Sequence, residues 1–266
     1  MPSLTIDFFH DVVCCWCFNI SSRMRHLASE FDLDIRHRTF VLQTSRAEMA
    51  ARWGTPEDAR ETILGHWAVC RQVSDRPDLV DIDAMRAAPF DYPHGMTAAL
   101  GCKAAERLGG QAAHWDMFDR LQRAHLTEAR DIADPATVLH AARELGFEAA
   151  AFAGVFDDPA TAQAVEADRQ YARALQVHSI PTLIVRETGA RLVNGPRDDL
   201  AAQLRTRPPP RRLKGIPMTL SILRTGARHR RRILRGVPHD LSPHLMRDIG
   251  LDPWPDRPRL PFHPLW

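Results

Sequence analysis

A pair of cysteines, Cys14 and Cys17, stands between a strand-like and a helix-like segment. The apolar run of residues 4–9 comes just before the motif Cys14-Cys15-Trp16-Cys17, so the motif is predicted to lie at a strand-to-helix turn. This places Cys14 at the amino end of a helix, where unpaired backbone N–H groups and the helix dipole stabilise a thiolate. Cys17 follows about one helical turn later. The spacing therefore predicts a thiol–disulfide site that contains a nucleophile and a resolving partner.

The cysteines do not have the pattern of a structural zinc site. Such sites usually show a second pair of cysteine or histidine ligands at matching spacing, and the sequence shows none, so no metal is expected. Cys70 and Cys102 stand singly in helix-like sequence and are predicted to be buried. Two readings of Cys15 are open: an exposed third thiol that pairs with a substrate or with glutathione, or a residue that the motif tolerates. Trp16 is expected to be exposed and to contact substrate.

A second motif lies far downstream at Ile180-Pro181-Thr182, where a β-branched run begins with a proline. Proline cannot donate to a sheet ladder, so it belongs at the first residue of a strand. Dithiol oxidoreductases of the thioredoxin type carry a step of this kind, with a cis peptide bond, opposite the Cys-x-x-Cys. Together the two motifs indicate a site in which Ile180 and Pro181 border the thiols. Asp11, just before the cysteines, is either a turn residue or a group that tunes the thiolate.

Three segments together resemble a known family. Residues 11–18, residues 168–175 followed by Val177, and the Ile180-Pro181-Thr182 step are similar to the cytosolic branch of the DsbA family, the FrnE-like oxidoreductases related to 2-hydroxychromene-2-carboxylate isomerase and kappa-class glutathione transferases. The resemblance covers roughly residues 3–200. It implies a thioredoxin fold with a helical insertion, with Cys14 as nucleophile and Cys17 as resolver. The family commonly has proline where this chain has Cys15, and the isomerase and transferase relatives have serine where it has Cys14.

The predicted elements give an α/β chain: a thioredoxin-like fold with a helical insertion, plus a basic helical or extended C-terminal tail. Residues 46–164 are rich in alanine, leucine, glutamate and arginine and are predicted to form several helices, laid over the active-site face as a small lid, with a stop at residues 109–110. Strands are predicted at residues 3–9, 33–42, 182–186 and 191–194, and further helices at residues 17–30, 168–175 and 197–204.

Charge divides the chain into two unlike parts. Residues 1–200 hold 21 lysines and arginines against 29 acidic residues, a net charge of −8, whereas residues 201–266 hold 14 against 4, a net charge of +10. We therefore expect a DsbA-like domain over residues 1–207, a proline-containing linker over residues 208–222 and an arginine-rich segment over residues 223–266.

The arginine-rich segment has its own candidate partners. Six arginines fall within residues 224–235, interleaved with apolar side chains, as in a basic amphipathic helix. Such a helix binds RNA, an anionic membrane surface or an acidic partner; the alternative is a solvated tail that pairs with the acidic domain. Residues 230–251 also resemble a short arginine-rich bacterial domain of unknown function.

Composition favours a cytoplasmic protein. No apolar stretch approaches the length that spans a bilayer, residues 1–3 lack the start of a signal peptide, and five cysteines favour catalytic or free thiols. Three functions are open. The first is a thiol–disulfide oxidoreductase acting on protein or small-thiol substrates, which requires no cofactor but for which glutathione is a candidate co-substrate. The others are a glutathione-dependent transferase or isomerase, and a redox-sensing binding protein acting through its basic tail. The sequence favours the first and leaves the oligomeric state open.

Overall fold

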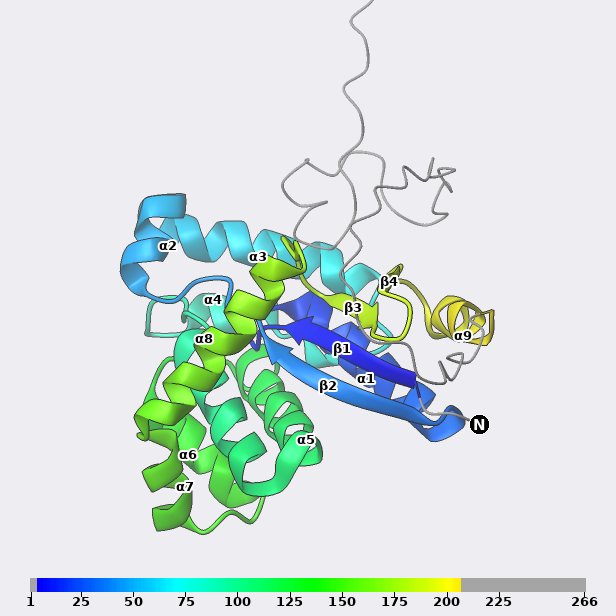
Figure 1. The fold of residues 1–266 in the computed structure, drawn as a ribbon. Coiled ribbons are helices and arrows are strands. Elements are labelled where there is room, and N and C mark those ends of the chain that lie inside the picture. The colour runs from blue at the N-terminus through cyan, green and yellow to red at the C-terminus, as the bar shows by residue number, and fades with distance from the viewer. Residues whose placement is uncertain (1–3, 207–266) are drawn as a thin grey trace, which may run out of the picture.

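The computed structural model describes residues 4–206, so the predicted linker and arginine-rich segment lie outside the described residues. At its centre is a four-stranded sheet with the order β2-β1-β3-β4 (Figure 1). β1 (Leu4–His10) pairs in parallel with β2 (Leu33–Thr39) and antiparallel with β3 (Thr182–Val185). β3 pairs antiparallel with β4 (Ala190–Leu192). This mixed sheet and its helices confirm the predicted α/β class and thioredoxin-like fold.

The helices fall into two groups. α1 (Cys15–Glu30) connects the two parallel strands, and α9 (Arg197–Arg205) follows the β3–β4 hairpin. The others lie between β2 and β3, and Figure 1 shows most of them on the side to which the arrows of β1 and β2 point. Across residues 4–206, none of the helices combines the length and the apolar character needed to cross a bilayer. The helices between β2 and β3 are α2 (Arg46–Trp53), α3 (Pro56–Gln72), the short 3-10 helix η1 (Pro77–Leu79), α4 (Ile82–Ala87), α5 (Met96–Leu126), α6 (Pro135–Glu144), α7 (Ala149–Phe156) and α8 (Pro159–Ala174).

The expected stop at residues 109–110 is confirmed, because Gly110 has the non-helical angles φ 72° and ψ −162° and divides α5 into two helical halves. One helix differs from the limits that the sequence predicts. α8 begins at Pro159, well before the expected start at Asp168. The reason is local, because the Asp158 side chain caps the helix and proline at the first helical position loses no hydrogen bond.

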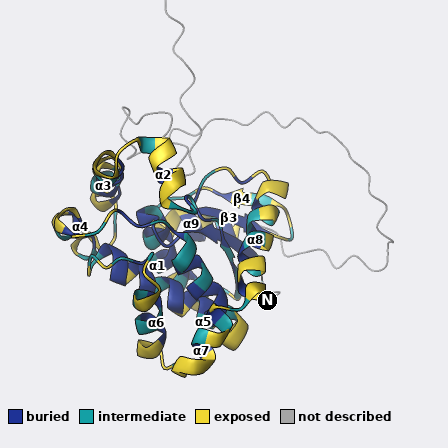
Figure 2. Cartoon of the chain, turned by 90° about the vertical axis from the view of Figure 1, so that its left-hand side faces the viewer, coloured by how far each residue is buried: buried dark blue, intermediate teal, exposed yellow. Residues whose placement is uncertain are grey.

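β1 is the central strand of the core. Its residues Ile6, Phe8 and Phe9 are fully buried, and Figure 2 shows a dark blue interior inside helices whose outer faces are yellow. Full burial of one such side chain stabilises the fold by about 1.5–3 kcal/mol. The strand therefore fixes the position of the loop that follows it.

A buried ion-pair network joins the sheet to α8. In β1, the Asp7 carboxylate accepts hydrogen bonds from the guanidinium groups of Arg186 at 2.7 Å and Arg38 at 2.9 Å. Burial alone would raise the pKa of Asp7, but the hydrogen bonds from Arg186 and Arg38 lower it below its usual value. In α8, Asp168 accepts from the backbone N–H of Thr39 at 3.0 Å and from Arg38 at 3.1 Å. The chain that leads from α8 to β3 is thereby anchored to the central strands.

Candidate dithiol site

The cysteine motif lies at the junction of β1 and α1, as predicted. β1 ends at His10, and Cys14 is the residue that caps α1, with φ −87° and ψ 105°. The Cys14 sulfur accepts a hydrogen bond from the backbone N–H of Cys17 at 3.3 Å. A negative charge on this sulfur is therefore stabilised by the amino end of the helix.

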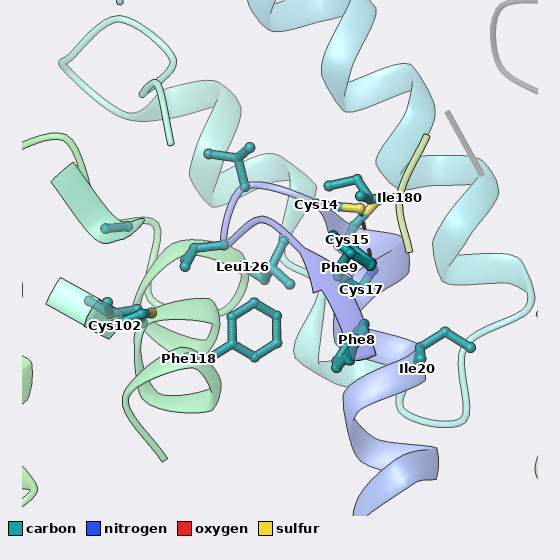
Figure 3. Packing of buried hydrophobic residues seen from close by; sticks show 14 of the residues in the cluster. Phe8, Phe9, Cys14, Cys15, Cys17, Ile20, Cys102, Phe118, Leu126 and Ile180 are labelled. Carbon is teal, nitrogen blue, oxygen red and sulfur yellow. Dashed lines mark hydrogen bonds between the residues drawn. The ribbon is translucent and has the colours of Figure 1, made fainter. Parts of the chain in front are cut away.

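The cysteines are all free thiols, but they differ in exposure. Cys14 exposes 6% of its surface and Cys17 none. Burial, followed by the hydrogen bond to Cys14, raises the pKa of Cys17 well above the usual thiol value. Cys17 is therefore a poor attacking group near neutral pH, whereas Cys14 retains contact with solvent. Cys70 and Cys102 are fully buried, as expected, and Figure 3 shows Cys102 well apart from the motif.

The structure decides between the two readings of Cys15 and corrects the expectation for Trp16. Cys15 is buried, which excludes an exposed third thiol, and burial, followed by its hydrogen bond with Cys70, raises its pKa well above the usual value. Trp16 is half-buried instead of exposed, and its indole nitrogen is shielded from solvent. Trp53 of α2 and His66 of α3, both from the helical insertion, line the same pocket as Trp16.

This pocket opens beside Cys14. Its cavity volume is about 50 Å³, within a hollow of about 500 Å³ that is open to solvent. Its walls are mainly apolar and aromatic, with Trp16 and Trp53 on two sides, and they also include Arg52 and His66. Mostly apolar walls with a few polar groups are typical of small-ligand sites. The insertion therefore forms one side of a candidate substrate pocket.

The proline motif lies at the same edge of the sheet. Thr182, the first residue of β3, pairs with Phe9 of β1, so Ile180 and Pro181 come just beyond the end of β1. The Ile180–Pro181 peptide bond is cis, and both residues are buried. Figure 3 shows the Ile180 side chain next to the Cys14 sulfur. The strand register therefore brings the two sequence motifs to one place.

Long-range hydrogen bonds hold the loop before α1. Gln122 of α5 donates to the Cys14 carbonyl at 2.9 Å, and the Tyr92 hydroxyl donates to the Val13 carbonyl at 3.4 Å. The Tyr92 oxygen also lies 2.9 Å from Nε2 of the buried His125. Sequence reasoning missed these residues because nothing in their spacing relates them to the cysteines. The insertion is thus part of the scaffold of the dithiol loop.

Asp11 is both a turn residue and a buried acid. Its carboxylate accepts from the backbone N–H groups of Leu42 at 2.6 Å and Val13 at 3.4 Å. Burial raises the pKa of Asp11 from 3.8 to about 6, although these hydrogen bonds oppose the rise. After the larger effects of burial and Cys14, the charge of Asp11 also raises the pKa of Cys17. The loop therefore holds a titrating group close to the resolving thiol.

Comparison with known proteins agrees with this arrangement. A family model described as a DSBA-like thioredoxin domain matches residues 5–205. Among curated proteins, the ClpXP adapter protein SpxH of Shouchella clausii is 23% identical over 181 residues, which is 68% of this chain. The match covers only 57% of that protein's length.

Solved structures show the same fold over most of the chain. A Nitrosomonas europaea protein described provisionally as a protein disulfide isomerase superposes with a TM-score of 0.64, at 21% identity over 77% of this chain and 97% of that one. The cytosolic disulfide reductase DsbM of Pseudomonas aeruginosa superposes with a TM-score of 0.60, at 26% identity over 76% of this chain and 98% of that one. DsbM is also known in a structure with GSH, at 27% identity and a TM-score of 0.57.

Proposed function

Because this chain belongs to the family of DSBA-like thioredoxin domains, we propose that it is a thiol–disulfide oxidoreductase acting through Cys14 and Cys17. One observation carries the proposal: the Cys14 sulfur caps α1, accepts the Cys17 backbone N–H and faces an open pocket. Cys17 is buried one turn further on, where its raised pKa keeps it protonated until a mixed disulfide forms. This difference assigns attack to Cys14 and resolution to Cys17.

In the proposed cycle, the Cys14 thiolate attacks one sulfur of a substrate disulfide. A mixed disulfide forms at Cys14, and the other substrate sulfur leaves as a thiolate. The Cys17 thiol then gives its proton to water, and its sulfur attacks the Cys14 sulfur. The bond between Cys14 and the substrate breaks, the second substrate sulfur leaves as a thiolate, and a Cys14–Cys17 disulfide forms. The substrate has gained two electrons and the dithiol has lost two. Two glutathione molecules restore the dithiol and leave as one oxidised glutathione.

Glutathione is the proposed co-substrate, and protein or small-thiol disulfides are the proposed substrates. DsbM, a cytosolic disulfide reductase, has been solved with GSH, and this supports both the co-substrate and a cytoplasmic location. Arg52, whose guanidinium lies 4.9 Å from the centre of the Trp53 ring, and His66 line the same pocket as Cys14. Trp16, Ile180 and Pro181 are the proposed contacts for the substrate chain next to the thiols.

Trapping tests the proposal. A Cys17→Ala variant should accumulate a mixed disulfide between Cys14 and glutathione or a protein substrate, detected by mass spectrometry without reductant. Cys14→Ser should abolish both the trapped species and glutathione-dependent reduction of insulin, whereas Cys102→Ala, a matched change of a distant buried thiol, should leave reduction within about twofold of the parent. If Cys17→Ala turns over at the parental rate, the chemistry needs only one thiol and the dithiol cycle is wrong. That outcome would favour the glutathione transferase or isomerase branch.

A further inference from the structure

Three buried histidines from different elements meet in the interior next to the dithiol loop. They are His10 at the end of β1, His37 in β2 and His114 in α5, and each is at most 1% exposed. The ring centres of His10 and His37 are 5.2 Å apart, those of His10 and His114 5.2 Å, and those of His37 and His114 5.0 Å. One ring nitrogen of each lies within 4.8 Å of the other two. The proposed thiol chemistry uses none of them.

The triangle has the dimensions of a tris-imidazole metal site. A zinc–nitrogen bond of about 2.0–2.1 Å puts each ring centre roughly 3 Å from the ion, so that three ligands in tetrahedral directions have ring centres about 5 Å apart. Nitrogens bound to one such ion lie about 3.3 Å from each other. Nε2 of His10 and Nδ1 of His37 are 3.1 Å apart. The His10–His37 edge of the triangle therefore needs little rearrangement to share an ion.

His114 also has the outer contact that is typical of a metal ligand. Its Nδ1 lies 2.7 Å from Oε2 of Glu106, and its Nε2 has no hydrogen-bond partner among the described residues. Glu106 is itself held by Gln111, whose side-chain N–H donates to it at 2.8 Å. A carboxylate behind a histidine fixes the tautomer and makes the free nitrogen a better ligand. Nε2 of His114 is thus the nitrogen left for an ion.

The histidines differ in what their second ring nitrogen contacts. Nδ1 of His10 and Nε2 of His37, the ring nitrogens that would not bind the ion, have no partner within residues 4–206, so among the three only His114 has an outer carboxylate. The Lys103 ammonium acts on all three histidines, but it lies 2.7 Å from Glu106 and 2.6 Å from Asp168, so two carboxylates offset its charge. Of these two carboxylates, Asp168 is shared with Arg38.

We propose that His10, His37 and His114 bind a divalent transition-metal ion, with zinc as the best fit. Neutral imidazole suits zinc and its neighbours in the transition series, whereas calcium and magnesium prefer oxygen ligands. The ion joins β1, β2 and α5, and its ligand His10 directly precedes Asp11 of the dithiol loop. Its role is to fasten the base of the dithiol loop, so that its removal lowers stability.

The test uses the full chain with Cys14, Cys15 and Cys17 replaced by serine, because thiolates also bind zinc. The protein is unfolded with a chelator and refolded with or without zinc. Metal content is measured after unbound metal has been removed, and melting temperature is measured with and without free zinc in the buffer. We expect one zinc per chain that depends on the three histidines, and a rise in melting temperature of roughly 5 °C or more when free zinc exceeds its Kd about a hundredfold. Cobalt refolded in place of zinc should give the visible spectrum of a tetrahedral ion with nitrogen ligands.

Single substitutions locate the site. His114→Asn and His37→Asn should each lose the bound zinc and the zinc-dependent rise in melting temperature. The control is His140→Asn on α6, an exposed histidine outside the cluster, and it should keep both. Histidines in residues 207–266 are the same in every variant, so metal held there cancels in the comparison. Equal zinc content and equal thermal response in His114→Asn and His140→Asn would overturn the proposal. If the cluster variants do not fold, the cobalt spectrum of the parent protein tests the site instead. A tetrahedral spectrum with nitrogen ligands supports the site, and the spectrum of a water-ligated octahedral ion would refute it.

Discussion

Replacing Gly95 with alanine should release the acid that holds the dithiol loop. Gly95 precedes α5 with φ −80° and ψ −13°, a conformation that alanine adopts readily. A Cβ at this position would lie 2.3 Å from Oδ1 and 2.5 Å from Oδ2 of Asp11. The Asp11 side chain cannot move away without losing hydrogen bonds, because it is buried and its oxygens accept from the backbone N–H groups of Leu42 and Val13. Gly95→Ala must therefore break these hydrogen bonds.

The expected cost follows from those contacts. The bond to Leu42, at 2.6 Å, is the strong one, and a hydrogen bond to a charged group contributes about 1.5–3 kcal/mol. The bond to Val13, at 3.4 Å, adds less. Alanine is also a poorer residue than glycine just before a helix. We expect Gly95→Ala to lower the free energy of unfolding by about 2–4 kcal/mol at pH 7, a large share of a typical 5–15 kcal/mol.

Urea unfolding followed by far-ultraviolet circular dichroism measures this change. Gly65→Ala is the matched control, because it lies within α3 and a Cβ there meets no atom within 4 Å, so it should stabilise the protein by about 0.5–1 kcal/mol. In an Asp11→Ala background the cost of Gly95→Ala should nearly vanish, because the clash is gone. A Gly95→Ala protein within about 0.5 kcal/mol of the parent, or an equal loss in both backgrounds, would refute the role given to Asp11.

Three further outcomes are expected. Brief iodoacetamide treatment near neutral pH should label Cys14 before Cys17, Cys70 or Cys102, because Cys14 alone caps a helix and Cys17 has a raised pKa; peptide mass spectrometry that finds Cys17 labelled first contradicts the assignment. The pKa of Asp11 is about 6 in the folded protein and 3.8 in the unfolded chain. The free energy of unfolding should therefore fall as pH rises from about 4 to 6, and above pH 6 the loss should reach about 3 kcal/mol. The urea midpoint should be lower at pH 7.5 than at pH 4.5 in the parent protein, and the difference should be smaller in Asp11→Asn. An equal difference in the two proteins would refute this explanation. Truncation after Arg207 should preserve insulin reduction but abolish any salt-sensitive retention on RNA or heparin, and loss of reduction would show that the tail belongs to the catalytic domain.

The sequence predicted what depends on neighbouring residues. The first strand, the cap at Cys14 and the strand start after Pro181 each have signals within a few positions, and the structure has all three. The early start of α8 also has a local signal, because an aspartate followed by a proline at residues 158–159 is typical of the first residues of a helix.

Features built from distant residues were out of reach. Gln122 meets Cys14 across 108 positions, and only the folded insertion brings them together. The histidine cluster was missed for the same reason: a search for regular ligand spacing cannot detect His10, His37 and His114, which come from two strands and a helix. The only local hint was a histidine inside each of two strand-like runs.

The hydrogen bond from Gln122 to Cys14 also determines when the cysteine motif becomes protected during synthesis. Translation adds about 5–20 residues per second, so Gln122 is made roughly 5–20 s after Cys14, and Ile184, the sheet partner of Asp7, is made later still. Throughout this interval the nascent chain carries three closely spaced thiols that the finished domain largely buries. Cys15 depends most on this timing, because it must be buried beside Cys70 before an oxidant in the cell joins it to Cys14 or Cys17 in a non-native disulfide. We therefore expect the yield of active protein to depend on how reducing the compartment is while the chain is being made.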